Sequence, residues 1–239
     1  VQDTSSSSAA AAPAAVSAAS ATTDLRSLSM SEVKDLLLDL LPRMTGKEEE
    51  FRTVEHYVNL LEEQYSPPQT LDFLNLAMTG TWQLLFSTNL RRGSKLKIRL
   101  RELTQRVETI GLKGRVNNVA LWDVALDPSS DVFDASGIFS VKCTYSINQG
   151  ARMVVDLDGH TIELAKGSKL PKDVPAVIAS IHGAMPPELF DPSEHAMDTT
   201  YLDGDLRIVR YTGPKYEGAR DIFIRSGSLE INPVAPDAA

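Results

Sequence analysis

From residue 81 onward, apolar and polar side chains alternate along one short run of sequence after another. The run 95–101 is the clearest, because Leu96, Ile98 and Leu100 share one side and four cations share the other. A period of two is typical of a β-strand with one buried face, and turn residues separate the runs. About eight such strands predict a mainly β fold, either an antiparallel barrel or a sandwich. The runs are 81–88, 95–101, 115–124, 137–147, 152–157, 160–164, 206–211 and 221–225.

Two amphipathic helices are expected before the strands. Apolar residues repeat at helical spacing over 33–41, and Ser29 with Glu32 forms a capping box at the start of that run. A second box, Thr45 with Glu48, predicts a longer helix that ends before the prolines at 67 and 68. These helices precede every strand.

The chain divides into four predicted parts. Residues 1–28 are rich in Ser, Ala and Pro and form a low-complexity tail, because they carry too few large apolar side chains to order on their own. Residues 29–70 form the helical segment, 71–232 the barrel, and 233–239 a C-terminal tail. Within the barrel, the proline-rich segment 170–190 interrupts the strand pattern and predicts a lid, a short helix or an interfacial loop.

Composition excludes several classes of protein. The net charge of -8 argues against nucleic-acid binding. The uncharged run 4–23 is too polar to span a membrane. Cys143 is the only cysteine, so it cannot close an internal disulfide, and its alternation with Phe139 and Val141 predicts a small buried side chain.

Known catalytic motifs are missing from the sequence. It has no nucleophile elbow, no phosphate-binding glycine loop and no His-Glu-x-x-His pair. The acidic loop with Glu188, Asp191, Glu194 and His195 can in principle meet a cation, but such a loop is more simply solvated. We therefore expect no enzyme activity, no metal and no required cofactor.

Gly80-Thr81-Trp82 opens the first strand and matches the glycine-x-tryptophan pattern of lipocalin-like barrels. In such barrels the tryptophan closes one end and an arginine from the last strands lies across its ring. Arg207 and Arg210 are the candidates for that arginine. The pattern favours a closed antiparallel barrel, with an interior that holds one small apolar ligand.

Two longer motifs resemble the plastid lipid-associated protein (fibrillin) family. They are Thr-Thr-Tyr-Leu-Asp-Gly-Asp-Leu-Arg-Ile-Val-Arg at 199–210 and Leu-x-x-x-Met-Thr-Gly-Thr-Trp-Gln-Leu-Leu-Phe-Ser-Thr at 74–88. Helices, a tryptophan strand and a barrel that ends in the Tyr-Leu-Asp-x-Asp-Leu-Arg motif match the family in order over about 31–231. Gly204 departs from the acidic residue often found there, and 212–219 lengthens the last hairpin.

The resemblance implies a nucleus-encoded plastid protein whose transit peptide is removed. Its expected location is the thylakoid membrane or the lipid globule (plastoglobule), and its expected role is to hold or escort carotenoids, prenylquinones or acyl lipids without enzymatic chemistry. The residues tied to the family motif are Tyr201, Asp203, Asp205, Arg207 and Arg210. The alternative is structural, with Asp203 and Asp205 capping a turn while Arg207 covers Trp82.

Alternation also predicts which side chains line the ligand cup. Each strand places its large apolar residues on one face, and Tyr201 is expected near the rim as a polar handle. A filled core without ligand is the alternative. The predicted lining is Trp82, Leu84, Phe86, Val141, Tyr145 and Phe223.

Charge is distributed unevenly. The segment 91–115 has nine basic and two acidic residues, a balance of +7, while the remainder carries -15. Its strand is expected to dock on anionic thylakoid lipid or an acidic protein edge, or alternatively to protect a sheet edge by charge. The cations that project together are Lys95, Lys97, Arg99 and Arg101.

A second hypothesis is a structural or assembly subunit of a photosystem or antenna supercomplex, with a vestigial cup. In that case the tail 1–23 lies extended along a partner, since small Ala and Ser side chains allow close approach. An enzyme that acts on lipid or pigment is the third hypothesis. Its best support would be an unexpected carboxylate inside the cup.

Overall fold

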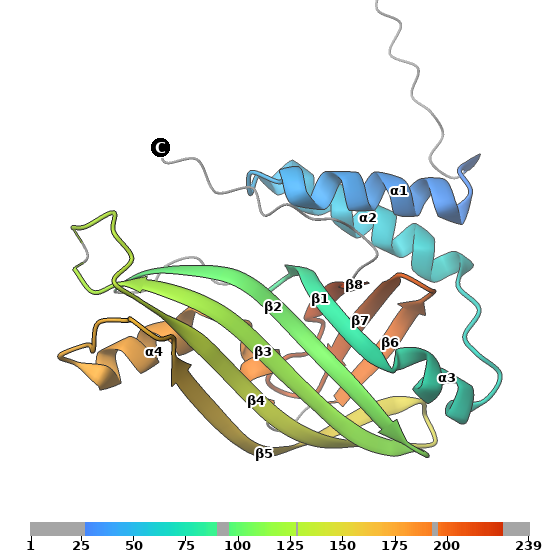
Figure 1. The fold of residues 1–239 in the computed structure, drawn as a ribbon. Coiled ribbons are helices and arrows are strands. Elements are labelled where there is room, and N and C mark those ends of the chain that lie inside the picture. Colours follow the sequence, from blue (N-terminus) through green and yellow to red (C-terminus); the bar gives the residue numbers. More distant parts are fainter. Residues whose placement is uncertain (1–26, 90–95, 128, 193–195, 227–239) are drawn as a thin grey trace, which may run out of the picture.

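The strands form a closed antiparallel barrel in which each strand pairs with the next and β1 pairs with β8 (Figure 1). The computed structural model describes residues 27–89, 96–127, 129–192 and 196–226. The terminal tails and Lys95 lie outside these ranges. The strands are β1 (Gly80–Ser87), β2 (Lys97–Ile110), β3 (Lys113–Ala125), β4 (Ala135–Ile147), β5 (Arg152–Leu164), β6 (Ala196–Leu202), β7 (Leu206–Thr212) and β8 (Arg220–Arg225).

The predicted mainly β barrel is confirmed, with differences in individual strands. The runs 152–157 and 160–164 are one strand, β5, whose pairing with β4 shifts between Lys142 and Cys143. Residues 102–110, most of which are polar, extend β2 well beyond its predicted end. Strand β6 was not predicted from its alternation, because its mixed sequence Ala-Met-Asp-Thr-Thr-Tyr-Leu has no clear apolar face. A register shift between Thr199 and Tyr201 disturbs the pattern further.

Helix α1 (Met30–Leu40) and helix α2 (Glu48–Gln64) lie together on the outside of the barrel, joined by the short helix η2 (Leu41–Arg43) (Figure 1). The capping box of Ser29 and Glu32 is confirmed. The predicted box of Thr45 and Glu48 is wrong. Helix α2 begins two residues later, with Lys47 as its N-cap residue, and Glu50 accepts hydrogen bonds from the amides of residues 45–47.

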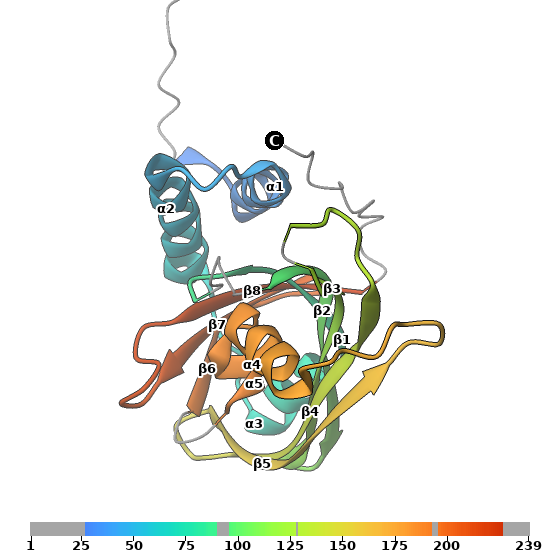
Figure 2. The ribbon, with the colours of Figure 1, turned by 90° about the vertical axis from the view of Figure 1, so that its left-hand side faces the viewer.

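The barrel has a helix at each end. Helix α3 (Leu71–Met78) covers one end, and the Trp82 indole donates to the Met78 carbonyl at 2.8 Å. Helices α4 (Val174–Ala184) and α5 (Pro187–Phe190) lie across the opposite mouth (Figure 2). Of the three alternatives for 170–190, the structure shows helix.

Two separate clusters of buried side chains result. One fills the barrel interior and includes residues of α3, α4 and α5. The other lies between α1–α2 and the outer faces of β6, β7 and β8, with Val33, Leu37, Val58 and Leu61 on the helical side. Strands β6–β8 are therefore buried on both faces, which explains the near-continuous apolar sequence of 222–224.

Candidate functional site

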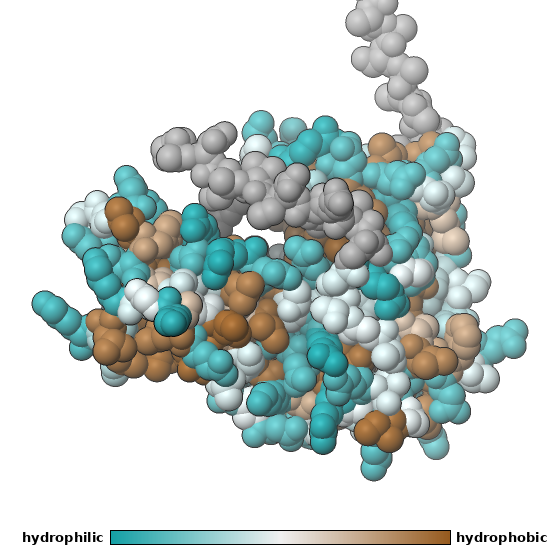
Figure 3. Space-filling model, viewed as in Figure 1, coloured by the Kyte–Doolittle hydropathy of each residue, from teal (hydrophilic) through white to brown (hydrophobic). Residues whose placement is uncertain are grey.

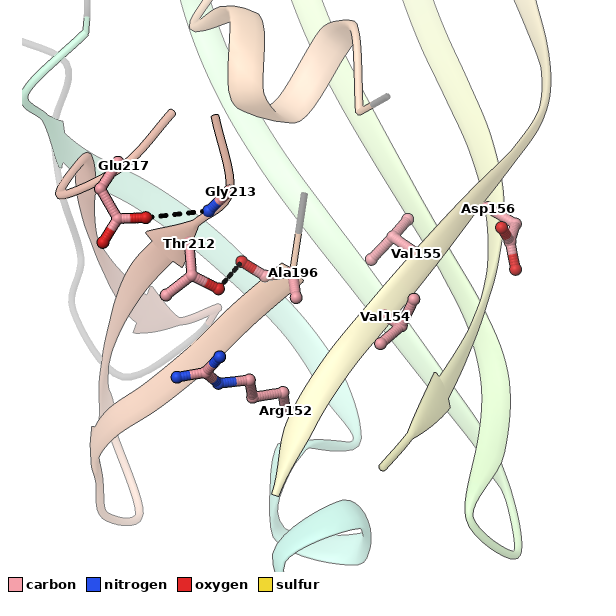
Figure 4. Close-up of a pocket in the computed structure, with 8 residues that line it drawn as sticks. All are labelled: Arg152, Val154, Val155, Asp156, Ala196, Thr212, Gly213 and Glu217. Carbon is pink, nitrogen blue, oxygen red and sulfur yellow. Dashed lines mark hydrogen bonds between the residues drawn. The ribbon is translucent and has the colours of Figure 1, made fainter. Parts of the chain in front are cut away.

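Strands β5 and β6 are joined by a short ladder. Within the described residues three pairs form it, from Arg152 with Asp198 to Val154 with Ala196. A slot of about 530 Å³ lies beside this ladder (Figure 4). It is lined by Arg152, Val154, Val155, Asp156, Ala196, Thr212, Gly213 and Glu217.

Three apolar residues on the inward face of β5 are exposed. Leu157, Ile162 and Leu164 pair with inward-facing positions of β4, yet they are 41%, 36% and 42% exposed. An inward apolar face is normally covered by the opposite wall of the barrel. Here it leaves apolar surface of the interior open to the outside.

A helical plug, defined here as α4 and α5, fills the mouth. Its side chains Val177, Ile181, Met185, Leu189 and Phe190 belong to the interior cluster. The Asn118 amide donates to the Leu189 carbonyl at 2.6 Å, and a ring nitrogen of His160 lies 3.2 Å from the Phe190 carbonyl. These contacts fix backbone atoms of α5 to the inner walls of β3 and β5.

The other face of the plug is apolar and exposed. Leu170, Val174 and Ile178 are 80%, 48% and 36% exposed, and Val174 and Ile178 share one side of α4. Figure 3 shows apolar surface at this end of the molecule. These three exposed residues, Leu170, Val174 and Ile178, are called the lip of the plug here. A cleft of about 730 Å³ lies beside this lip. Its lining includes Leu96, Leu126, Leu170, Ala176 and Val177 as well as polar Asp134 and Lys169.

Two carboxylates, those of Glu188 and Asp221, lie buried inside the barrel. The expectation that Glu188 lies in a solvated loop is wrong, because it belongs to α5 and is 1% exposed, and Asp221 was not predicted as a site residue. Glu188 of α5 accepts from the Ser87 hydroxyl at 2.7 Å and from the Asn89 amide at 3.1 Å. Asp221 accepts from the Tyr211 hydroxyl at 2.8 Å. Burial, together with the charge of Glu188, raises the pKa of Asp221 well above its usual value. The signal was available, since 221 lies two residues before inward-facing Phe223.

These carboxylates have a structural explanation. Glu188 fastens α5 to β1, and burial raises the pKa of Asp221, which favours the protonated form of its carboxyl. Cys143 is buried as predicted, and burial raises the pKa of its thiol to about 12, so it is a weak nucleophile. The described residues contain no group of three or more His, Cys, Asp or Glu positioned for a metal ion.

The predicted cup residues fall on two sides of the wall. Trp82, Val141, Tyr145 and Phe223 are buried in the interior, and Leu84 packs against them.

Phe86 was expected in the cup and Tyr201 near its rim, and both expectations are wrong. Both face the helical layer, Phe86 beside Phe51 and Tyr201 beside Tyr65. A bulge between Leu84 and Phe86, and another between Thr199 and Tyr201, reverse the direction of the side chains.

The residues of the Tyr-Leu-Asp-x-Asp-Leu-Arg motif do not form one site either, because they lie in a turn and on both faces of the barrel wall. Asp203 caps the turn between β6 and β7, accepting from the amides of Asp205 and Leu206 at 2.8 and 2.7 Å. Its other oxygen accepts from Lys34 at 2.8 Å and from the Tyr201 hydroxyl at 2.9 Å. The turn and helix α1 are thereby joined.

The arginines have different roles from those expected. Arg210 points outward and binds both carboxylate oxygens of Glu62 on α2, at 3.1 and 2.5 Å. Arg207 points inward and is fully buried. Neither covers Trp82, so that expectation is wrong. Arg225 covers the ring instead, because the inward register of β8 brings it opposite Trp82.

The predicted docking cations are largely paired. Arg99 and Arg101 both contact Asp123, at 2.6 and 3.2 Å, and Lys97 contacts Asp131. Lys95 lies outside the described residues. The cation row therefore presents less free charge than its sequence indicates.

A model of the protein family described as PAP_fibrillin matches residues 34–216 of the chain. That range begins in α1, contains the plug and every lining residue of the slot except Glu217, and ends in the turn after β7. No curated protein matches the sequence. Among the described helices, none has the length and apolarity needed to cross a bilayer.

Proposed function

The chain belongs to the PAP/fibrillin family of plastid lipid-associated proteins, which are generally not enzymes, and from this premise we propose that it binds an apolar molecule inside its barrel at a lipid surface. The proposed ligand is a carotenoid, a prenylquinone or an acyl lipid. The proposed location is the thylakoid membrane or a plastid lipid globule.

The observation that supports this function best is the exposed apolar face of β5. Leu157, Ile162 and Leu164 face inward but remain more than a third exposed. Exposed inward apolar positions on the strand that also lines the slot provide an entry for a long apolar molecule, since each buried methylene of such a ligand contributes about 0.8 kcal/mol. A barrel with a purely structural role gains nothing from this exposure.

The lip of the plug supports contact with lipid. Leu170, Val174 and Ile178 are exposed, and the cations Lys169 and Lys172 flank Leu170. Apolar side chains beside lysines are suited to the boundary between lipid headgroups and acyl chains. Contact at this lip would bring the cleft and the barrel mouth to the source of the ligand.

The test has two parts on the purified full chain. First, a solvent extract of the native protein, and titration with a carotenoid, a prenylquinone and a galactolipid, measure ligand content and saturable uptake. Second, flotation with thylakoid-lipid vesicles compares wild type with the double variant Leu170→Ser and Ile178→Ser. Ile110→Ser is the matched control, because Ile110 is 76% exposed at the opposite end of the barrel.

We expect saturable uptake of at least one class, and loss of flotation in the double variant alone. An empty extract together with no uptake from any of the three classes would exclude ligand carriage.

The second candidate function is a structural or assembly subunit of a photosystem or antenna complex. The packing of the interior favours it, because Trp82, Trp122, Phe139 and Phe223 are all fully buried by the protein's own residues. Deletion of residues 1–23 followed by native electrophoresis of plastid membranes tests it. Co-migration lost on deletion, with an empty extract, would favour this function over carriage.

A further inference from the structure

Arg207 is a charged side chain sealed inside the barrel. It is 0% exposed, and within the described part of the chain it makes no ion pair. Burial lowers the pKa of its guanidinium to about 10, so the group remains charged at neutral pH. A buried charge without a counter-charge is costly, and such groups are ordinarily paired or bound to a ligand.

The hydrogen bonds of Arg207 leave one particular edge free. Nη1 donates to Gln105 Oε1 at 2.7 Å, while Nε and Nη2 have no hydrogen-bond partner. Nε and Nη2 lie on the same side of the planar guanidinium, with their N–H bonds parallel. That pair of donors matches the two oxygens of a carboxylate, which accepts both bonds at once.

Most of the inner acceptors near this edge are already engaged. Gln105 donates onward to Asn118 at 3.0 Å, and Asn118 donates to the plug. The Tyr145 hydroxyl donates to Asn75 at 2.6 Å, and Asp221 Oδ2 accepts from Tyr211, while Asp221 Oδ1 has no hydrogen-bond partner. The charge of Asp221 acts to raise the pKa of Arg207, but within the described residues no ion pair joins the two side chains.

The surroundings of Arg207 fit an apolar tail. The Phe223 ring centroid lies 5.8 Å from the guanidinium carbon. The inward residues that follow along β6 and β7, Val209, Tyr211 and Met197, belong to the apolar interior and end beside the slot. Met153, Met185 and Met197 lie in the same cluster, and their flexible side chains can rearrange around a guest.

We propose that the barrel binds a long-chain carboxylic acid, with its carboxylate on the Nε–Nη2 edge of Arg207 and its tail along β6–β7 toward the slot. The inference rests on the proposed function and narrows it from apolar molecules in general to free acyl acids. A quinone, a carotene or an esterified lipid cannot accept both donors as an anion.

The experiment measures binding to delipidated full-length protein by calorimetry, with oleate, methyl oleate, a prenylquinone and acetate as ligands. We expect wild type to prefer oleate over methyl oleate by about tenfold or more, because a charge-assisted bidentate contact is lost in the ester. Acetate should not bind, since it lacks the tail.

Two variants of Arg207 and one control test whether Arg207 causes the preference for oleate over methyl oleate. Arg207→Met, which keeps the apolar volume, should bind oleate and methyl oleate equally. Arg207→Lys should keep a reduced preference, because one point charge replaces the fork. Arg106→Met removes an exposed arginine from the outer face of β2 and should leave the preference unchanged.

A readout on wild type alone covers the case in which a variant fails to fold. The carboxyl carbon of ¹³C-labelled oleate reports the pKa of the bound acid, which should fall below that of oleate in solution. Equal binding of acid and ester, or an unshifted pKa, overturns the inference while the proposed function stands. Absence of binding by the acid, the ester and the quinone overturns both.

Discussion

The guanidinium carbon of Arg225 lies 4.2 Å from the centroid of the Trp82 ring. The same side chain donates to the carbonyls of Gly204, Thr79 and Ala77 at 2.7, 2.8 and 3.0 Å. It therefore joins β8 to the β6–β7 turn and to the end of α3. Gly80 is required here, because a Cβ at that position would lie 2.6 Å from Arg225 Nη1 and its φ is +136°.

Arg225→Lys should lower the free energy of unfolding by about 2 kcal/mol, since it loses part of the cation–π contact and leaves carbonyl acceptors without donors. Urea denaturation measures the change. Arg106→Lys is the control, and its effect should be under about 0.5 kcal/mol at an exposed site. Equal effects of the two variants would contradict the role assigned to Arg225.

Asp203 gives a pH-dependent prediction. Burial acts to raise its pKa, but hydrogen bonds from Lys34 and from two backbone amides prevail and lower it. A carboxyl with a lowered folded pKa stabilises the fold above its ordinary pKa, and this contribution disappears as the pH falls through the folded pKa.

Asp203→Ala should therefore cost about 1–3 kcal/mol at neutral pH and progressively less in acid. Asp203→Asn keeps the turn-capping oxygen and should cost less than Asp203→Ala. Chemical denaturation from pH 7 down to pH 3 makes the comparison. A penalty that stays constant with pH would mean that the charge of Asp203 contributes nothing.

Asp221 should show the opposite pH dependence. Its pKa is raised well above 3.8 by burial and by Glu188, so the folded state holds a proton that the unfolded state releases. Stability should therefore decline as the pH rises from the ordinary aspartate pKa toward the folded pKa. Asp221→Asn resembles the protonated form and should flatten this decline. Thermal melts across pH 4–9 test it, and an unchanged slope in the variant would show that another group is responsible.

Phe86 should matter for the helical layer and not for the interior. Its ring lies 6.0 Å from that of Phe51 on α2. Phe86→Ala should reduce stability by about 1–2 kcal/mol and speed proteolysis within α1–α2, while ligand uptake is retained. Leu84→Ala, which truncates a neighbouring residue packed on the interior, is the matched comparison. If ligand uptake is lost in Phe86→Ala but retained in Leu84→Ala, Phe86 lines the cup after all.

The ion pairs of Asp123 reduce the positive charge that the outer face of β2 can offer to a membrane. Its carboxylate contacts both Arg99 and Arg101 and is itself nearly buried. Asp123→Asn should release Arg99 and Arg101 from their ion pairs and increase pelleting with anionic vesicles. The free energy of membrane binding should become more favourable by about 1 kcal/mol per released cation, and this gain should be lost at high salt. Vesicles of neutral lipid are the control. If Asp123→Asn leaves pelleting unchanged, the cations do not dock on lipid, and their role is to protect the sheet edge by charge.

The sequence determined the strands of the barrel where alternation was regular. Runs such as 137–147 bury every second residue, and each inward side chain lies where its parity predicts. Helix α1 was equally determined, because Ser29 and Glu32 form a cap from residues three apart in the chain. Local chemistry of this kind needs no distant partner.

Only the tertiary structure decided which side of the wall the remaining residues face. Bulges at Leu84–Phe86 and at Thr199–Tyr201 each change the parity by one residue, and nothing in the local sequence marks them. The partner of Trp82 depends on the register of β8, which brings Arg225 opposite the indole and turns Arg207 inward. Long-range register thus decided the content of the interior, because a shift of one residue moves a side chain through the wall of the barrel.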